Sequence, residues 1–353
     1  MAGRDINGSN YLGNDKRKLS RIALISRNFI KYWTIRQVIT IVTTFLLVSH
    51  YLIADTQVHR LHFLIPGGAG GGWDGTARGV GEALTKSGLV KHISYQNMSG
   101  GGGGRAIAHL VKTAKRQQDT LMVNSTPIVI RSLQKIFSHS FQDLTPIAAV
   151  VADYGVFAVV NESEIQNWQQ AVTLFQNDPS QLTVSGGSGR GSMDHLVAAL
   201  AFQAVGEDPK KVRYIPYDAG GKAMAGLLSG ETKILSTGLG EALEQHRSGQ
   251  IRILAITANE RSPVVPNVPT FKELGYEVVF INWRGFFGPP DLSQEKVKIY
   301  SKTLEKMFQT PDWEKVRIRN GWKNLYIPGE KFHNFLMQQE SMIGKLMKEL
   351  GFL

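Results

Sequence analysis

The chain has 353 residues, and 42% of them are hydrophobic, which is enough to pack the cores of about two domains of roughly 150 residues each. The formal net charge is +11 and there is no cysteine, which excludes a disulfide, a thiolate metal site and a cysteine nucleophile. Glycine is the unusual residue, with 37 copies that follow no G-X-Y period, so a collagen-like chain is excluded. Many of these glycines fall in three short stretches, 67–75, 100–104 and 186–191.

Positive charge is concentrated at the N-terminal end of the chain. Residues 1–54 contain eight lysines and arginines but only two aspartates, so this segment contributes more than half of the net charge. The remainder has no stripe of lysine and arginine of the kind that binds a phosphate backbone. We therefore expect no nucleic-acid partner.

An apolar segment, residues 38–53, follows this basic stretch and contains no Asp, Glu, Lys or Arg. A basic region, a short apolar run and the small residue Ala54 are typical of a secretory signal peptide. The alternative is an uncleaved membrane anchor, although a spanning helix needs around 20 apolar residues. Under either interpretation we expect the rest of the chain, from about residue 55, to lie in an extracytoplasmic space.

Apolar runs of strand length alternate with segments of helical periodicity from residue 61 onward. Strands are expected at 61–65, 92–96, 120–124, 147–160, 181–185, 212–215, 233–237 and 251–257. Helices are expected at 73–84, 105–114, 168–175, 193–205, 222–228, 241–248, 294–308 and 330–350. This alternation predicts an α/β protein of two lobes, with mainly parallel sheets covered on both faces.

Each glycine-rich stretch follows an expected strand and precedes an expected helix. In open α/β sheets, ligands bind beyond the carboxyl ends of the strands. Helix N-termini at that edge present unpaired backbone N–H groups and the positive end of the helix dipole. Glycine lets a ligand approach the backbone closely. Three such loops predict a site for anionic groups.

A nucleotide cofactor is the first competing interpretation of the glycines. Residues 70–75 formally fit the dinucleotide pattern G-x-G-x-x-G. That pattern also needs an acidic residue about 20 positions further on, to bind the ribose, and the sequence has Gln96 and Asn97 there. We therefore expect no cofactor.

A catalytic site is the second competing interpretation. Asp194 and His195 lie beside Ser192, but adjacent residues on a helix point to different faces, and Ser192 fits the N-cap position of the helix. The nine histidines show no metal-ligand spacing. The sequence thus predicts neither a catalytic residue nor a metal site, and hence no enzyme.

Several motifs resemble those of the substrate-binding proteins of tripartite tricarboxylate transporters. The string Pro-Gly-Gly-Ala-Gly-Gly-Gly-Trp-Asp-Gly-Thr-Ala-Arg at 66–78 resembles the first ligand loop of that family, and its Gly-Gly-Gly-Trp-Asp part is more similar to the tricarboxylate-binding branch. The resemblance continues in the same order to the C-terminus, through 99–104, 185–196, 214–221, 236–241 and 282–290.

The resemblance implies a type II periplasmic binding protein fold, in which two α/β lobes joined by two crossing strands hold a ligand in the cleft between them. Lobe one would comprise 58–152 and 285–353, and lobe two 153–284. The implied function is capture of a small carboxylate, with a citrate-like tricarboxylate favoured. The implied partners are the large and small subunits of a membrane permease, and we expect the receptor itself to be a monomer.

Placed on this sequence, the resemblance implies that backbone N–H groups of 67–72 and 186–191 hold the carboxylates, assisted by nearby hydroxyl groups. Asp74 either complements the helix dipole or accepts hydrogen bonds from ligand hydroxyls. Arg78, Arg105, Arg190 and Arg284 are candidates for a positive charge, and Arg190 is favoured because it lies inside a ligand loop. The predicted ligand-binding residues are Gly67, Gly68, Gly70, Gly71, Gly72, Trp73, Asp74, Ser125, Thr126, Ser185, Ser188, Gly189, Arg190, Gly191, Ser192, Thr237 and Gly238.

Two other functions are compatible with the sequence. A ligand-sensing protein that reports to a signalling receptor would use the same binding site. An enzyme acting on a carboxylate would need an acid, base or nucleophile placed in the cleft, and no motif supplies one.

Overall fold

The computed structural model of the protein describes residues 58–353. The leader expected at 1–54, with its signal peptide or anchor, lies outside the described residues. No helix within 58–353 combines the length and the apolar character needed to cross a bilayer.

The strands are arranged in the order β2-β1-β3-β9-β4-β7-β5-β6, and β8 and β10 both pair with β4. We call β1, β2 and β3 the first strand group, and β5, β6 and β7 the second. Their bounds are β1 (Val58–Ile65), β2 (Val90–Asn97), β3 (Thr120–Ser125), β4 (Thr145–Val160), β5 (Thr183–Gly186), β6 (Arg213–Pro216), β7 (Ile234–Gly238), β8 (Ile251–Ile256), β9 (Ile281–Gly288) and β10 (Lys323–Pro328).

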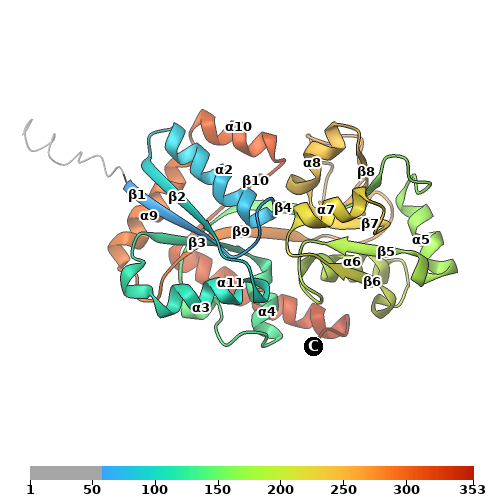
Figure 1. Ribbon diagram of the computed structural model, residues 1–353, viewed down its shortest axis with the longest axis horizontal. Coiled ribbons are helices and arrows are strands. Elements are labelled where there is room, and N and C mark those ends of the chain that lie inside the picture. The colour runs from blue at the N-terminus through green and yellow to red at the C-terminus, as the bar shows by residue number, and fades with distance from the viewer. Residues whose placement is uncertain (1–57) are drawn as a thin grey trace, which may run out of the picture. The chain divides into compact units, whose positions relative to one another are not determined.

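Strand direction differs between the outer and the central parts of this arrangement. β1 runs parallel to β2 and β3, and β5 runs parallel to β6 and β7, as predicted. The prediction of mainly parallel sheets is wrong for β4, which pairs antiparallel with β7, β8, β9 and β10. Part of the physical reason is that β9 and β10, for which no strand was expected, lie beside β4 and run in the opposite direction. Figure 1 shows β4 and β9 running between the two strand groups.

All eight predicted helices are present, and each end lies within two residues of its expected position. Two helices, α4 and α10, were not predicted. The helices are α2 (Gly72–Lys86), α3 (Gly104–Lys112), α4 (Thr126–Leu133), α5 (Trp168–Asn177), α6 (Met193–Ala204), α7 (Gly220–Leu228), α8 (Leu239–Arg247), α9 (Gln294–Met307), α10 (Pro311–Arg319) and α11 (Gly329–Glu349).

Helices cover both faces of the first strand group, because alternate side chains of a strand point to opposite faces. On β1, Phe63 and Ile65 pack in one buried cluster with apolar residues of α2, α9 and α10. Leu64 packs in another, with residues of α3, α4 and α11. Figure 1 shows α2 and α10 on one side of these strands and α3, α4 and α11 on the other.

The second strand group is covered in the same way. Leu235 of β7 packs with residues of α7 and α8, whereas Ile234 of β7 and Val184 of β5 belong to the cluster that contains residues of α5 and α6. Because both groups are covered on their faces, the loops at their strand ends are free to form a site.

Candidate ligand-binding site

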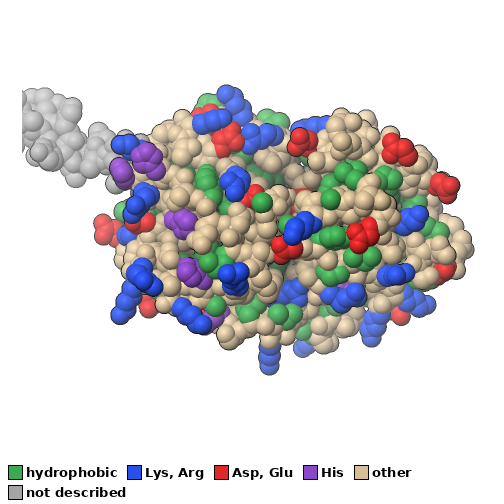
Figure 2. Space-filling view, viewed as in Figure 1, with side chains coloured by type: hydrophobic (Ala, Val, Ile, Leu, Met, Phe, Trp, Pro, Cys, Tyr) green, Lys and Arg blue, Asp and Glu red, His purple; other side chains and the backbone are tan. Residues whose placement is uncertain are grey.

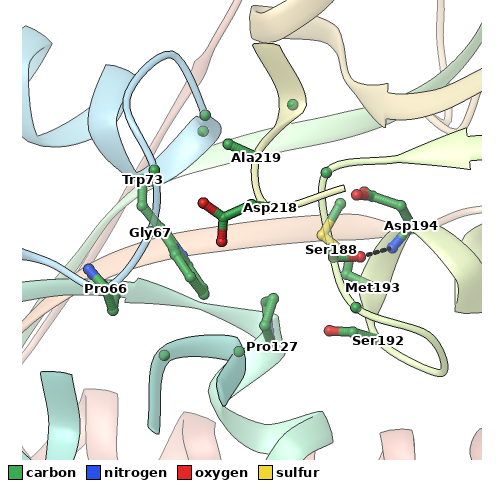
Figure 3. Close-up of a pocket in the computed structure, with 18 of the residues that line it drawn as sticks. Pro66, Gly67, Trp73, Pro127, Ser188, Ser192, Met193, Asp194, Asp218 and Ala219 are labelled. Carbon is green, nitrogen blue, oxygen red and sulfur yellow. Dashed lines mark hydrogen bonds between the residues drawn. The ribbon is translucent and has the colours of Figure 1, made fainter. Parts of the chain in front are cut away.

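A cavity of about 270 Å³ lies between the loops that follow β1, β2 and β3 and the loops that follow β5 and β6. These are the carboxyl ends of the parallel strands, where α/β proteins bind ligands. In Figure 3, Pro66 and Trp73 lie on one side of the cavity and Ser188, Ser192 and Asp194 on the other, with Asp218 between them.

Four helices begin in the wall of this cavity. Residues at the N-termini of α2, α4, α6 and α7 line it, among them Gly72, Ser125, Ser192 and Gly220. None of these four helices has a side-chain hydrogen bond at its N-cap. Not every N–H group of the first turns is free, because Pro127 has none and the Asp194 N–H donates to Ser188 Oγ, but the four helix dipoles all favour negative charge in the cavity.

The predicted ligand-binding residues divide into two sets. Those that line the cavity are Gly67, Gly68, Gly71, Gly72, Trp73, Ser125, Ser188, Gly189 and Ser192. Those that the structure places outside its lining are Gly70, Asp74, Thr126, Ser185, Arg190, Gly191, Thr237 and Gly238.

The first glycine-rich loop is held against the ring of Trp73. A Cβ atom on Gly67 would come within 2.9 Å of Trp73 Cε3, so a larger residue there would displace the indole. The ring N–H of Trp73 donates a hydrogen bond of 2.8 Å to Ser125 Oγ, which joins the start of α2 to the end of β3. The indole is half-buried and forms part of the cavity wall.

Asp74 has three hydrogen-bond partners within its own half of the structure. Its carboxylate accepts from the N–H of Gly70 at 3.1 Å, from Arg78 Nε at 2.9 Å and from Asn97 Nδ2 at 3.0 Å. The side chain is buried, with 6% of the residue surface exposed. This carboxylate therefore fixes the shape of the first loop.

Arg190 points away from the cavity, and another arginine lies behind the same loop. The Arg190 guanidinium is exposed and donates to the carbonyl oxygen of Tyr214 at 2.8 Å. Arg131 of α4, which the sequence did not single out, is only 5% exposed and donates to the carbonyl oxygen of Arg190 at 3.0 Å. Its guanidinium occupies the space that side chains at Gly102 and Gly189 would fill.

Arg131 has no acidic side chain within 4.0 Å among residues 58–353. Burial lowers the pKa of its guanidinium from the usual value, but an arginine keeps its proton at neutral pH. Gly102 and Gly189, which cover it, both line the cavity. Arg131 therefore places an unpaired positive charge behind this wall.

A second arginine, Arg284 on β9, lies in the cavity wall itself. It is 2% exposed, and its Nη2 donates to Asp153 Oδ2 of β4 at 2.5 Å. Its Nη1 donates to the carbonyl oxygen of Gly72 and to Thr76 Oγ1, which ties the start of α2 to the central strands. Glu241 Oε2 of α8 lies 3.9 Å from Arg284 Nη2. Arg284 therefore has both Asp153 and Glu241 as neighbours.

Burial raises the pKa values of the acidic groups around Arg284. It raises those of Asp153 and Glu241, in each case against the opposing charge of Arg284. Asp194, at the start of α6, also lines the cavity, and burial together with the nearby Glu241 raises its pKa to about 7. At neutral pH the wall can therefore present carboxyl groups that are partly protonated.

Contacts between the loops of the two strand groups cover the cavity. Ser99, after β2, donates its hydroxyl hydrogen to Asp218, after β6. A Cβ atom on Gly71 would lie 3.2 Å from the Cβ of Ala219, so the first loop touches the loop before α7. On the outer face shown in Figure 2, acidic and basic side chains are interspersed.

Sequence reasoning did not select several residues of the wall, namely Asp194, Asp218, Glu241 and Asn282. All four lie inside the motifs that carry the family resemblance, but only the fold brings them together in one wall. Chemically, the wall supplies backbone N–H donors, hydroxyl groups and carboxyl groups. Within the described residues, no group of His, Cys, Asp and Glu is arranged to hold a metal ion.

Comparison with known proteins gives the class of this receptor. Residues 76–352 match the model of the "Tripartite tricarboxylate transporter family receptor", and the chain belongs to this family. One relative is Protein BugT of Bordetella pertussis, which is 28% identical over 266 residues, covering 73% of this chain and 79% of BugT.

Solved structures support the same fold at low sequence identity. The periplasmic binding protein BugD superposes with a TM-score of 0.75 at 20% identity, covering 83% of this chain and 98% of BugD. MatC from Rhodopseudomonas palustris with bound malate has a TM-score of 0.71 at 21% identity, covering 81% and 98% of the two chains. Rpa4515 of the same organism, with adipate, has a TM-score of 0.73 at 19% identity, covering 83% and 97%. The fold is thus that of periplasmic binding proteins.

Proposed function

We propose that this protein captures a small carboxylate in the cavity and delivers it to the membrane permease of a tripartite tricarboxylate transporter. The observation that carries the proposal is the convergence of four helix N-termini on one cavity between glycine-rich loops. The family assignment supports a transport role, and the malate and adipate in the structures of MatC and Rpa4515 support a carboxylate ligand.

The finer parts of the proposal follow the same reasoning. The receptor acts as a periplasmic monomer, exported by its leader, and docks on the large and small permease subunits. Its two lobes, 58–152 with 285–353 and 153–284, close on the ligand about β4 and β9. Asp153 and Arg284, paired at 2.5 Å, lie at these two boundaries, which supports a hinge there. A citrate-like tricarboxylate is the first candidate ligand, and dicarboxylates such as malate and adipate are the next.

Thermal unfolding against a panel of carboxylates tests this function. Residues 55–353 contain the compact unit that begins at Gln57 and suit the measurement. A ligand at 100 times its Kd should add about 2.7 kcal/mol to the free energy of unfolding. We expect citrate, malate or adipate to raise the midpoint, and uncharged sugars to leave it unchanged. A shift with sugars and with no carboxylate would overturn the proposal.

A further inference from the structure

Three carboxyl groups, those of the buried Asp153 and Asp194 and of the partly buried Glu241, lie near a single guanidinium, that of Arg284, at the back of the cavity. Asp153 is 2.5 Å from Arg284 and Glu241 is 3.9 Å from it, whereas Asp194 has no cationic side chain within 4.0 Å among the described residues. One positive charge cannot neutralise three carboxylates in a region of low dielectric constant. This cluster is therefore more stable with some of its carboxyl groups protonated.

Among the three acids of this cluster, Asp194 has the fewest charged partners. It also faces the space in which a ligand would lie. It is 7% exposed and lines the cavity. The Ser188 hydroxyl and the Gly187 N–H are the neutral groups that interact with its carboxyl group and favour its ionised form. The Asp194 N–H in turn donates to Ser188 Oγ at 3.0 Å, the contact drawn in Figure 3. The side chain is thus held in place by neutral groups.

Charged and titratable groups reach Asp194 from several neighbouring elements. Glu241 comes from α8, Arg284 from β9 and Tyr214 from β6. Arg131 of α4 lies behind Gly189, on the other side of the loop before α6. The next residue, His195, stacks on Tyr214, with ring centroids 4.6 Å apart, and burial lowers its pKa to about 4. His195 is therefore neutral above pH 6, and no histidine lines the cavity.

Two further side chains in the same wall carry buried polar atoms that have no hydrogen-bond partner among residues 58–353. They are Asn282 Oδ1, an acceptor, and Arg284 Nε, a donor, on residues that are 4% and 2% exposed. Buried polar atoms normally have hydrogen-bond partners. A ligand with a hydroxyl and a carboxylate would offer a donor to Asn282 Oδ1 and an acceptor to Arg284 Nε, so these atoms suit a ligand placed against this acidic part of the wall.

We propose that Asp194 binds the ligand as a protonated carboxyl group that donates its O–H to a ligand carboxylate, so that the cavity takes up a proton from water when it binds. The inference rests on the proposed function, because it requires a carboxylate ligand. An added anion would otherwise be a fourth negative charge beside Asp153, Glu241 and Asp194. Burial and Glu241 already raise the pKa of Asp194 to about 7, and a bound anion raises it further.

Calorimetry of residues 55–353 with malate and with adipate tests this inference. Carboxyl groups with ordinary pKa values near 4 stay ionised between pH 6.5 and 8.5, so these probes do not themselves titrate. We expect Kd to rise by up to about tenfold per pH unit above pH 7, the limit for one linked proton. Titrations in two buffers with different heats of ionisation should show uptake of up to one proton per ligand at pH 8.

Three variants separate Asp194 from its neighbours. Asp194→Asn keeps a donor of the same shape and should bind with little dependence on pH and no proton uptake. Glu241→Gln removes one cause of the raised pKa, so the loss of affinity should begin at lower pH. Asp218→Asn changes a more exposed acid of the same wall, one that lies 3.7 Å from Lys222, and should retain the wild-type pH slope.

The possible outcomes distinguish this inference from the proposed function. Binding of malate or adipate by the wild type without proton uptake would overturn the role of Asp194 and leave the carboxylate receptor intact. The same pH slope in Asp194→Asn as in the wild type would also overturn it. If no carboxylate binds at any pH, the proposed function fails and this inference fails with it. The wild-type measurement is decisive even if a variant does not fold.

Discussion

The N-termini of α2 and α6 are built from the same parts but differ in electrostatics. Each follows a strand and a glycine-rich loop, and each has a buried aspartate in its first turn, Asp74 in α2 and Asp194 in α6. Asp74 is bound by Arg78, Asn97 and the N–H of Gly70. For Asp194 the strongest influence of another charged group is that of a second acid, Glu241, which raises its pKa.

This difference shows that the position of an acid in a helix does not determine its role. An aspartate near a helix N-terminus complements the dipole in either case. With an arginine within reach, it becomes part of the framework of the loop. Without one, it remains in the wall as a group whose protonation can respond to a ligand.

The largest expected effect comes from replacing Arg284, the buried cation of the acidic cluster that contains Asp194. Arg284→Met leaves Asp153 and Glu241 without their common partner, and breaking a buried pair costs about 3–5 kcal/mol. Denaturant unfolding at pH 7 measures this loss, which should shrink as the pH is lowered, because burial raises the pKa values of both acids. The control is Arg78→Met, an exposed arginine that pairs with Asp74 and should cost far less. Equal losses in both variants would contradict the prediction.

The next effect concerns the framework role of Asp74. Asp74→Asn weakens three hydrogen bonds, two of them to neutral donors and one to Arg78, and should lower the free energy of unfolding by about 1–3 kcal/mol at neutral pH. Denaturant unfolding at neutral pH is the measurement, and an unchanged stability would remove Asp74 from the framework.

The same substitution at Asp194 should raise the free energy of unfolding instead of lowering it. The folded-state pKa of Asp194 is raised to about 7 from 3.8, so its contribution to stability is lost as the pH rises between these values. Asp194→Asn removes this loss and should stabilise the ligand-free protein by on the order of 1–2 kcal/mol at pH 8, with almost no gain at pH 4. Thermal unfolding at the two pH values measures it. A loss of stability at pH 8 would contradict this prediction and would show that Asp194, like Asp74, belongs to the framework of its loop.

The loops of the site could be predicted from the sequence because the residues that define each loop are adjacent in the chain. The glycines of 67–72 and 186–191 lie directly between a strand and a helix, and the structure has them there. The cluster of Asp153, Asp194, Glu241 and Arg284 could not be predicted, because its members come from four elements far apart in the sequence. Asp153 and Arg284 are separated by 131 positions and meet only when β4 and β9 pair.

Two missed elements had misleading local signals. The run Pro-Ile-Val-Ile in α4 is rich in β-branched residues and does not indicate a helix, yet Pro127 in its first turn is compatible with a helix start. In β9, Arg284 and Gly285 interrupt an aromatic run and weaken the strand pattern. The charge is tolerated there because its partner lies on the neighbouring strand, which the local sequence does not reveal.

The position of Trp73 should allow ligand binding to be followed by intrinsic tryptophan fluorescence. The other tryptophans of the described chain, at 168, 283, 313 and 322, are almost completely buried in the cores. Trp73 alone among them forms part of the cavity wall, where its ring N–H bonds to Ser125. A ligand entering the cavity changes the polarity around this indole and leaves the other four in place. Emission of the unlabelled protein should therefore report occupancy, and Trp73→Phe should silence the response.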